Sequence, residues 1–315
     1  MLARDILIQN KIAECEKKIA LLHKRFPRLE EIAQEVSRLS IERIRVGLIE
    51  RNTEKAKSID KKVLNLLKEK EYILKANNLP LDIYEPDWDC PQCKDRGYIE
   101  PGVLCECFKQ ERYDRIFSQS GLIGNMREKT FANFNVNYYL DPAGMEKKVE
   151  RCKEFAAKLI KKEPQNNLFF TGEVGRGKTH MSVAIANEVM KQGVTVIYKR
   201  IDDLLDIIRE YKYQREENGP SETSQLEFLV DVDLLIIDDL GTESLTPFAE
   251  NQLRMLIEDR NNLNKPWIIN SNLSIKELQT KYGQRITDRI IEKTDIFAFE
   301  SSMSIRELLR RGIGQ

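Results

Sequence analysis

A glycine-rich segment near the middle of the chain has the composition and spacing of a phosphate-binding loop. It fits the pattern G-x-x-x-x-G-K-[ST], follows an apolar run and leads into a segment with helical periodicity. Its residues are Gly172, Glu173, Val174, Gly175, Arg176, Gly177, Lys178 and Thr179, with His180 directly after them. In such a loop, backbone N–H groups and the helix N-terminus bind phosphate oxygens. We therefore predict a nucleotide site in which Lys178 reaches the β and γ phosphates and Thr179 ligates Mg²⁺.

Two adjacent aspartates further along the chain supply the second half of such a site. Asp238 and Asp239 follow the apolar run 234–237, which is typical of a strand buried on both faces of a parallel sheet. Ligands of open α/β sheets bind at the C-terminal ends of such strands. We predict that Asp238 holds the Mg²⁺ shell and that Asp239 polarises the attacking water. A helix N-cap is the alternative, and the phosphate-binding loop upstream argues against it.

Small polar residues end a further predicted strand, 267–269, and could complete the site. An amide at this position can orient the water between Asp239 and the γ phosphate. We select Asn272 for this role, with Asn270 and Ser271 as alternatives.

Two arginines follow on a predicted helix. Arg285 and Arg289 are four residues apart and therefore share one helix face. One interpretation is an arginine finger. The other, which the spacing alone favours, is an exposed pair or a local link to Asp288.

A cluster of cysteines precedes the nucleotide-binding region and has the spacing of a metal site. The ligand candidates are Cys90, Cys93, Cys105 and Cys107, in the pattern C-x₂-C…C-x-C. The intervening residues can form a hairpin that turns at 100–102 and brings the two pairs together. Four thiolates in tetrahedral geometry suit a structural Zn²⁺ site, and a module this small needs such a support to fold. A disulfide pair or unliganded thiols are the alternatives.

The wider pattern places these motifs in an α/β fold. Short β-rich runs alternate with helical stretches after residue 166, which is typical of a parallel sheet with helices on both faces. Residues 1 to about 79 show helical periodicity instead, with a break at Pro27. We divide the chain into a helical N-terminal region (1–80), a zinc-binding module (81–115), a linker (116–140) and an ATPase domain (141–315).

Composition excludes several classes of protein. The 315 residues carry 51 Lys and Arg against 51 Asp and Glu, whereas proteins that bind nucleic acid by bulk charge are usually basic. No apolar run approaches the ~18–20 residues of a membrane span, and the mixed charges of the N-terminus do not suit a signal peptide. Only six cysteines occur, so the chain is not a disulfide scaffold. We expect a cytoplasmic protein with no membrane partner, and any contact with nucleic acid must be local.

Five motifs together resemble those of the AAA+ ATPases of the DnaC/DnaI type, the bacterial replicative helicase loaders. The resemblance covers about residues 125–310 and lies in the order and spacing of the motifs. They are TFANF at 130–134, GEVGRGKTH at 172–180, LLIIDDLG at 234–241, IINSNLS at 268–274 and GQRITDRI at 283–290. The resemblance implies an AAA+ ATPase domain that binds ATP and Mg²⁺ and associates with further copies of itself.

The resemblance also implies roles for individual residues. Phe131 and Phe134 look like packing beside the adenine. Arg289 matches the finger that reaches the ATP of a neighbouring subunit, with Arg285 in support, and Arg306 looks like an arginine placed near the nucleotide from the C-terminal end. The chain after the last predicted strand is too short for the multi-helix lid of larger AAA+ proteins.

A DNA contact is implied as well. In the family, an inserted helix between two strands lines a path for single-stranded DNA, and the matching segment here is about 202–227. Aromatic and basic side chains alternate in it, which suits base stacking with phosphate contact: Arg209, Tyr211, Lys212 and Tyr213. The alternative is a solvated basic helix end.

Taken with the resemblance, these features predict an ATP-dependent loader of a hexameric, DnaB-type replicative helicase. The N-terminal helices and the zinc module, which resembles cysteine-rich modules of DnaI-type loaders, would bind the helicase. The ATPase domain would contact single-stranded DNA during primosome assembly. The nearest alternative is an IstB-like ATPase helper of a transposase. A small-molecule kinase and a zinc-centred adaptor with a structural ATP site are further alternatives.

Overall fold

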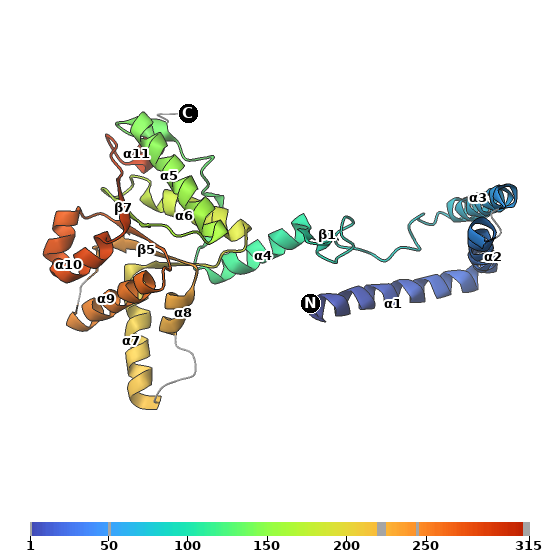
Figure 1. Ribbon diagram of the computed structural model, residues 1–315, viewed down its shortest axis with the longest axis horizontal. Helices are drawn as coiled ribbons and strands as arrows, with labels where there is room; N and C mark the ends of the chain where they lie inside the picture. Colours follow the sequence, from blue (N-terminus) through green and yellow to red (C-terminus); the bar gives the residue numbers. More distant parts are fainter. Residues whose placement is uncertain (1, 50–51, 219–224, 244–245, 311–315) are drawn as a thin grey trace. The chain divides into compact units, whose positions relative to one another are not determined.

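The structure is a computed structural model that describes residues 2–49, 52–218, 225–243 and 246–310. The chain divides into two compact units, Met1–Cys107 and Phe108–Gln315, and Figure 1 colours them along the sequence from blue to red. The cysteine cluster therefore lies in the first unit and the phosphate-binding loop in the second.

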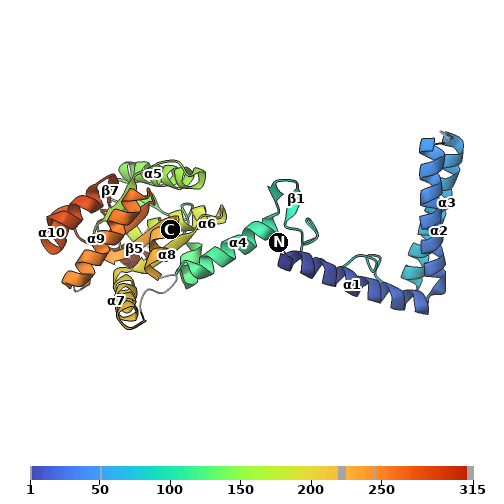
Figure 2. The same cartoon turned by 60° about the horizontal axis from the view of Figure 1, so that its bottom comes forward.

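Long helices build most of the first unit. They are α1 (Leu2–Arg25), α2 (Pro27–Ile44), the π-helical η1 (Arg45–Ile49) and α3 (Thr53–Ala76). Pro27 ends α1 and starts α2, because a proline at the first helical position loses no hydrogen bond. The side chain of Asn52 accepts a hydrogen bond from the backbone N–H of Lys55 and so caps α3. Helices α2 and α3 lie side by side in both orientations of the chain (Figure 1, Figure 2).

A small hairpin follows and carries the cysteines. Strands β1 (Tyr98–Glu100) and β2 (Val103–Leu104) pair antiparallel, as predicted, and Gly102 takes a positive φ of 84° in the turn between them. Helix α4 (Glu106–Gln119) begins directly after Cys105, so Cys107 lies in its first turn. The hairpin and the start of α4 thus bring the two cysteine pairs to one place.

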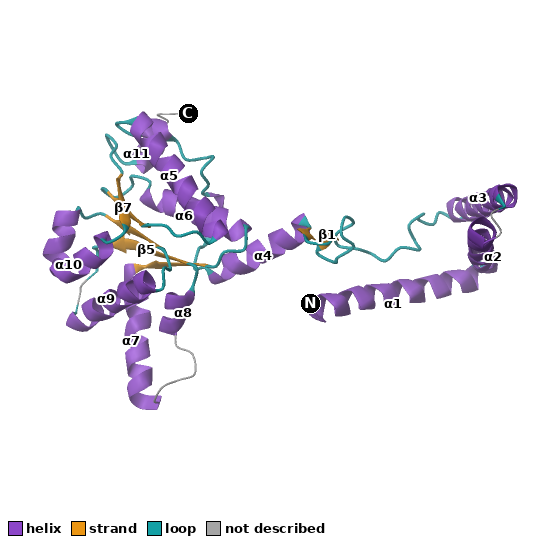
Figure 3. Cartoon of the chain, in the orientation of Figure 1, coloured by secondary structure: helices purple, strands orange, loops and turns teal. Residues whose placement is uncertain are grey.

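The second unit is built on a parallel sheet (Figure 3). Its strands are β3 (Asn167–Thr171), β4 (Val196–Arg200), β5 (Leu234–Leu240), β6 (Trp267–Ser271) and β7 (Thr294–Ala298). Within the described residues the order is β4-β5-β6-β3-β7, and every pairing is parallel. The carboxyl ends of the strands therefore meet at one edge, where β3 leads into the phosphate-binding loop and β5 carries the paired aspartates.

Helices cover both faces of this sheet, which confirms the predicted α/β fold. On one face lie α5 (Pro142–Lys161) and α6 (Lys178–Lys191), and on the other lie α7 (Ile201–Asn218), α8 (Gln225–Asp231), α9 (Pro247–Asn262) and α10 (Ile275–Ile291). Neighbouring residues of one strand enter different cores: Phe170 packs on the α5–α6 side and Phe169 on the other. Short helical turns, η2 (Gly124–Glu128), η3 (Val136–Tyr138) and α11 (Ile305–Arg310), flank the domain core.

A buried arginine holds one connection of the domain. The guanidinium of Arg260 is fully buried and donates to the carbonyl oxygens of Leu229, Val230 and Val232, at the C-terminal end of α8, at 2.7 to 3.1 Å. It also donates to the carbonyl of Pro266, just before β6, at 2.6 Å. The carbonyls at the end of α8 need donors from elsewhere, because the last turn of a helix leaves its own carbonyls free.

Candidate functional site

The phosphate-binding loop runs from the end of β3 to the start of α6 and is enclosed by two other segments. A Cβ at Gly175 would collide with the side chain of Ser304, and one at Gly177 would collide with the hydroxyl of Tyr139. Both glycines also have positive φ angles, 79° and 92°, which disfavour any other residue. The loop therefore needs glycine for its conformation and for the close approach of its neighbours, as well as for phosphate binding.

A cavity of about 1000 Å³ opens along this loop, which is the size class of sites for small ligands. Lys178, Thr179 and Asp239 line its polar side, and Arg306 of α11 lines it from the C-terminal end. The cavity therefore brings together the predicted residues of the loop, of the acidic strand and of the C-terminal helix.

Lys178 folds back onto the loop that it follows. Its ammonium group is buried and donates to the carbonyl oxygens of Gly172 and Glu173. Burial lowers the pKa of Lys178, and the charges of Asp238 and Asp239 oppose that shift. Phosphate oxygens would offer the ammonium group stronger acceptors than these two carbonyls.

Asp238 is the centre of a buried hydrogen-bond network. Its Oδ2 accepts from the hydroxyls of Thr179, at 3.0 Å, and Tyr198, and its Oδ1 accepts from the side-chain amide of Asn270 and the backbone N–H of Asp239 at 2.8 and 3.0 Å. A carboxylate beside a hydroxyl is a set of hard oxygen donors, which suits Mg²⁺. Asp238 and Thr179 therefore fit the metal role predicted for them.

Asp239 faces the cavity in a different environment. It is half-buried and has a left-handed φ of 59°, a conformation that non-glycine residues keep only where their surroundings impose it. Burial and then the neighbouring charge of Asp238 raise its pKa, while Arg200, 3.7 Å away, opposes the shift. A raised pKa makes this carboxylate a better proton acceptor, which suits a group that polarises water.

The polar residues that end β6 take different positions from one another. Asn270 is fully buried and bonds Asp238, whereas Asn272, which we selected from the sequence, follows the strand and is exposed beside Gly241. The hydroxyl of Ser271 donates to the carbonyl of Leu240. The structure thus brings Asn270 rather than Asn272 into contact with the acidic pair.

Aromatic side chains close the other side of the cavity. Phe134 lines it, stacks on Tyr139 with ring centroids 5.5 Å apart and meets the ring of His180 edge-on. Nε2 of His180 lies 3.0 Å from the carbonyl oxygen of Thr130, so the histidine bonds to the TFANF segment. Phe131 packs against the domain core instead of lining the cavity. Tyr139, which donates to the carbonyl of Arg176, is a lining residue that the motif pattern missed.

The two arginines of α10 do not line this cavity. The helix has a kink at Gly283, where φ is 74° and ψ is 168°, and both arginines follow it and are exposed. Arg289 pairs with Glu258 at 3.1 Å and with Glu292 at 2.9 Å. Arg285 forms no ion pair with any residue that the structure describes.

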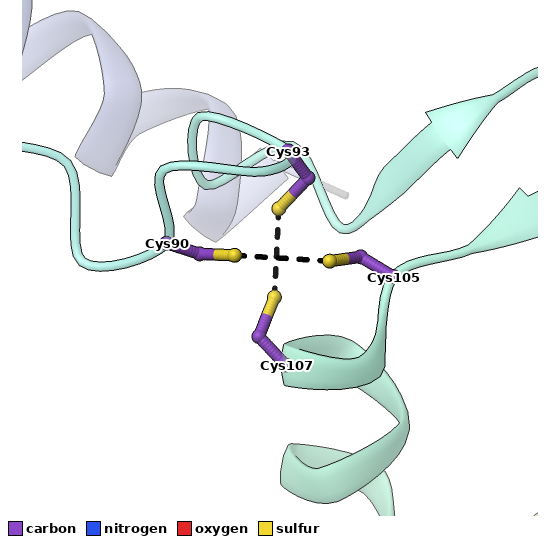
Figure 4. A group of neighbouring side chains, drawn as sticks. All are labelled: Cys90, Cys93, Cys105 and Cys107. Carbon is purple, nitrogen blue, oxygen red and sulfur yellow. Dashed lines mark hydrogen bonds between the residues drawn. The ribbon is translucent and has the colours of Figure 1, made fainter.

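The cysteine cluster in the first unit has the geometry of a metal site. The four sulfur atoms all lie within 4.8 Å of one another and point to a common centre (Figure 4). The Sγ atoms of Cys90 and Cys105 are 3.7 Å apart, and those of Cys93 and Cys107 are 3.4 Å apart. Four sulfurs at about 2.3 Å from one ion would be about 3.8 Å apart, so the thiols fit a tetrahedral ion. The other two cysteines, Cys15 and Cys152, are buried.

Asp95 supports this cluster from outside it. Its carboxylate is buried and accepts from the backbone N–H groups of Asp89 and Cys90, at 3.1 and 2.8 Å, and from the ammonium of Lys11 in α1 at 2.8 Å. Burial opposes ionisation, but these hydrogen bonds together hold the pKa of Asp95 below its usual value. Asp95 therefore fixes the first cysteine and joins it to α1.

The predicted DNA segment is only partly described. Arg209 is exposed on α7 and pairs with Asp206 at 2.7 Å. The side chains of Tyr211, Lys212 and Tyr213 lie outside the described part of the chain.

Comparison with known families identifies the second unit. A family model described as "IstB-like ATP binding protein" matches residues 105–307, which is more than half of the chain. The chain belongs to this family. The cavity beside the glycine-rich loop is thus an ATP site, and the domain is an ATPase. No helix within the described residues is long and apolar enough to cross a membrane.

Individual relatives are more distant. The replicative helicase loader DnaC of Escherichia coli is 24% identical over 197 residues, which is 62% of this chain and 77% of that protein. The uncharacterized protein YdaV of E. coli is 28% identical over 182 residues, or 58% of this chain and 69% of that protein. A crystal structure of DnaI is 22% identical, with a TM-score of 0.45 over 57% of this chain and 93% of that one.

Two substitutions separate nucleotide binding from hydrolysis. We expect Lys178→Ala to weaken ATP binding and abolish hydrolysis, because it removes the buried cation of the loop. Asp239→Asn should leave binding intact and lower hydrolysis by about 100-fold or more, because an amide polarises water poorly. Fluorescent-nucleotide binding and phosphate release would measure the two effects.

Lys191→Ala, at the exposed far end of the same helix, is the control and should behave as wild type in both assays. Normal turnover by Asp239→Asn would mean that another residue polarises the attacking water.

Proposed function

We propose that this protein is an ATP-dependent loader of a hexameric, DnaB-type replicative helicase onto single-stranded DNA, acting in the cytoplasm as part of primosome assembly. The observation that carries the proposal is an ATP site whose own chain places two exposed arginines outside it, on α10. Such an arrangement suits an ATPase whose site is completed by a second copy. The similarity to DnaC, a replicative helicase loader, supports the same assignment.

Within the ATP site, each residue has a role in hydrolysis. Lys178 would bind the β and γ phosphates, and Thr179 and Asp238 would hold Mg²⁺, which would supply positive charge beside the phosphate oxygens. Asp239 orients the attacking water toward the γ phosphorus and accepts its proton as the bond to the β-phosphate oxygen breaks. Arg306 balances charge from the far side of the cavity.

The first unit would bind the helicase. Apolar side chains at a spacing of three residues are exposed on both α2 and α3: Ile41 and Ile44 at 68% and 56%, and Leu64 and Leu67 at 52% and 44%. A contiguous set of exposed apolar groups marks a protein-binding surface, and we propose that these four side chains form one. We name these four residues the apolar patch and propose that the helicase covers it.

A Zn²⁺ ion held by the four cysteines would support this unit. The described part of the cysteine segment has only the short β1–β2 hairpin as regular structure before α4, so metal affinity would supply much of its folding free energy. Arg209 and the aromatic and basic residues after it on α7 would contact single-stranded DNA by stacking and by phosphate binding.

A transposase helper is the second candidate, because the matching family model carries the IstB description. The two candidates differ in their partner, a hexameric helicase or a transposase. Both use the same ATP site, so an ATPase assay alone does not separate them.

Capture of the replicative helicase tests the proposed function. The full chain should retain the purified helicase of its host, and Ile41→Asp combined with Ile44→Asp should reduce that retention by at least tenfold. Tyr72→Asp, a substitution at another exposed side chain of α3, is the matched control and should bind normally. Failure of the wild-type chain to bind the helicase, or capture of a transposase in its place, would contradict the assignment.

Metal removal gives a second prediction. The purified protein should contain one zinc ion per chain, and Cys93→Ser should lose it, unfold the cysteine segment and weaken helicase binding while ATP binding persists. Metal analysis and hydrogen exchange of residues 90–105 would report these effects.

Cys15→Ser, which alters a buried cysteine of the same unit outside the cluster, should keep its zinc. A folded cysteine segment with well under one zinc per chain would overturn the zinc assignment.

Arg289 should act on the ATP of a neighbouring copy. A guanidinium at the γ phosphate stabilises transition-state charge, so Arg289→Ala should bind ATP normally and hydrolyse it more slowly by on the order of 10³-fold. Mixing Arg289→Ala with Lys178→Ala should restore part of the activity, because some interfaces then contain an intact site and an intact finger.

The mixture should be assayed with DNA and helicase present, under conditions in which wild type assembles. A mixture that stays inactive under those conditions would mean that Arg289 serves only in surface salt bridges of its own chain.

A further inference from the structure

The carboxylate of Asp238 accepts a hydrogen bond that no part of the proposed ATP chemistry uses. Thr179 belongs to the phosphate-binding loop, and Asn270 is a candidate for orienting water, but the hydroxyl of Tyr198 has neither role. It donates to Oδ2 of Asp238, the same oxygen that accepts from Thr179. Tyr198 does not line the nucleotide cavity.

Tyr198 is rigidly placed. It is 7% exposed and lies in β4, where it pairs with Ile236 of β5 two residues before Asp238. Its backbone N–H donates to the carbonyl of Ser120 at 2.7 Å, and its own carbonyl lies against Gly121, where a Cβ would come within 2.5 Å of the oxygen. The strand on one side and the segment after α4 on the other therefore fix where the hydroxyl points.

The chemistry of the two hydroxyls on Oδ2 differs. A threonine hydroxyl can donate its proton to Asp238 while its oxygen faces a metal ion. Among the described residues, the tyrosine hydroxyl has the carboxylate of Asp238 as its only hydrogen-bond partner, and a phenol is a stronger donor than an alcohol. A tyrosine phenol is protonated throughout the neutral range and can therefore act as the donor in this hydrogen bond.

We propose that Tyr198 is a positioning residue for Mg²⁺: its hydroxyl holds the carboxylate of Asp238 in the orientation that receives the ion together with Thr179. Outer hydrogen bonds of this kind orient metal-binding carboxylates, and their loss typically costs 10- to 100-fold in metal affinity. The proposal rests on the ATP site of the proposed function and is independent of the partner that the protein loads.

Tyr198→Phe tests it, because the substitution keeps the ring and removes only the hydroxyl. Binding of trinitrophenyl-ATP should be measured as a function of free Mg²⁺ and again in EDTA. We expect the variant to bind the nucleotide within about twofold of wild type in EDTA. The free Mg²⁺ concentration that gives half of the metal-dependent change in nucleotide binding should rise about tenfold or more. At saturating Mg²⁺, the kcat for ATP hydrolysis should return toward the wild-type value.

Tyr282→Phe is the matched control. Tyr282 is 1% exposed, and its hydroxyl donates to the carboxylate of Glu243, in the loop after β5, rather than to Asp238. This variant loses the same kind of hydrogen bond and should keep the Mg²⁺ dependence of wild type. Thermal unfolding of both variants would show that each remains folded.

Three results would overturn the proposal. One is an unchanged Mg²⁺ dependence in folded Tyr198→Phe. Another is an equal rise in the half-effect Mg²⁺ concentration of Tyr282→Phe, which would indicate that the loss of any buried hydrogen bond loosens the domain. The third is a wild-type protein that binds ATP without any Mg²⁺ dependence, which would also contradict the proposed ATP chemistry; the first two leave that chemistry intact.

Discussion

The buried carboxylate of Asp238 is the constraint on which the second unit depends. A carboxylate that is only 3% exposed is stable only if hydrogen-bond donors surround it. Those donors come from four places in the chain, namely Thr179 at the start of α6, Tyr198 in β4, Asn270 in β6 and the next backbone N–H along β5. The parallel sheet meets this demand because the ends of its strands converge on one edge. The hydrogen bonds to this one carboxylate therefore align the phosphate-binding loop, the side chain of Thr179 and the end of β6 at the same edge of the sheet.

A second constraint acts on the nucleotide cavity, which segments far apart in the sequence enclose. The chain enters the domain past Phe134 and Tyr139, and it returns at the C-terminal end through Ser304 and Arg306, so both ends of the ATPase domain lie against the glycine-rich loop. The backbone N–H of residue 305 donates to the carbonyl of Gly175 at 2.9 Å, which ties the returning segment to the loop. The short helix α11 thus supplies a cationic group, Arg306, to the cavity.

The sequence predicts those parts of the site that depend on local spacing. The loop, the acidic pair and the cysteine cluster could each be found because neighbouring residues carry the chemistry and the adjacent strand or helix follows from periodicity. Contacts between strands could not be found in this way. The choice of Asn270 over Asn272 at Asp238, the hydroxyl of Tyr198 and the buried guanidinium of Arg260 all depend on register and packing, which one sequence does not specify. Tyr139 escaped notice because its role needs the entering segment to fold back on the loop.

The strength of the ion pairs of Arg289 bears on its proposed role as an arginine finger. In its own chain the guanidinium pairs with Glu258 and Glu292, and all three side chains are at least a quarter exposed. Exposed ion pairs of this kind contribute little to stability, because water screens them and ordering the side chains costs entropy. The γ phosphate of ATP carries more charge than a carboxylate and would lie in a site from which water is largely excluded, where electrostatic attraction is stronger. Breaking the ion pairs of Arg289 with the two carboxylates would therefore cost less free energy than contact with a neighbour's nucleotide would gain. The same two carboxylates would keep the arginine on the surface of α10 until a second copy arrives, so the ion pairs are compatible with a finger that acts only after assembly.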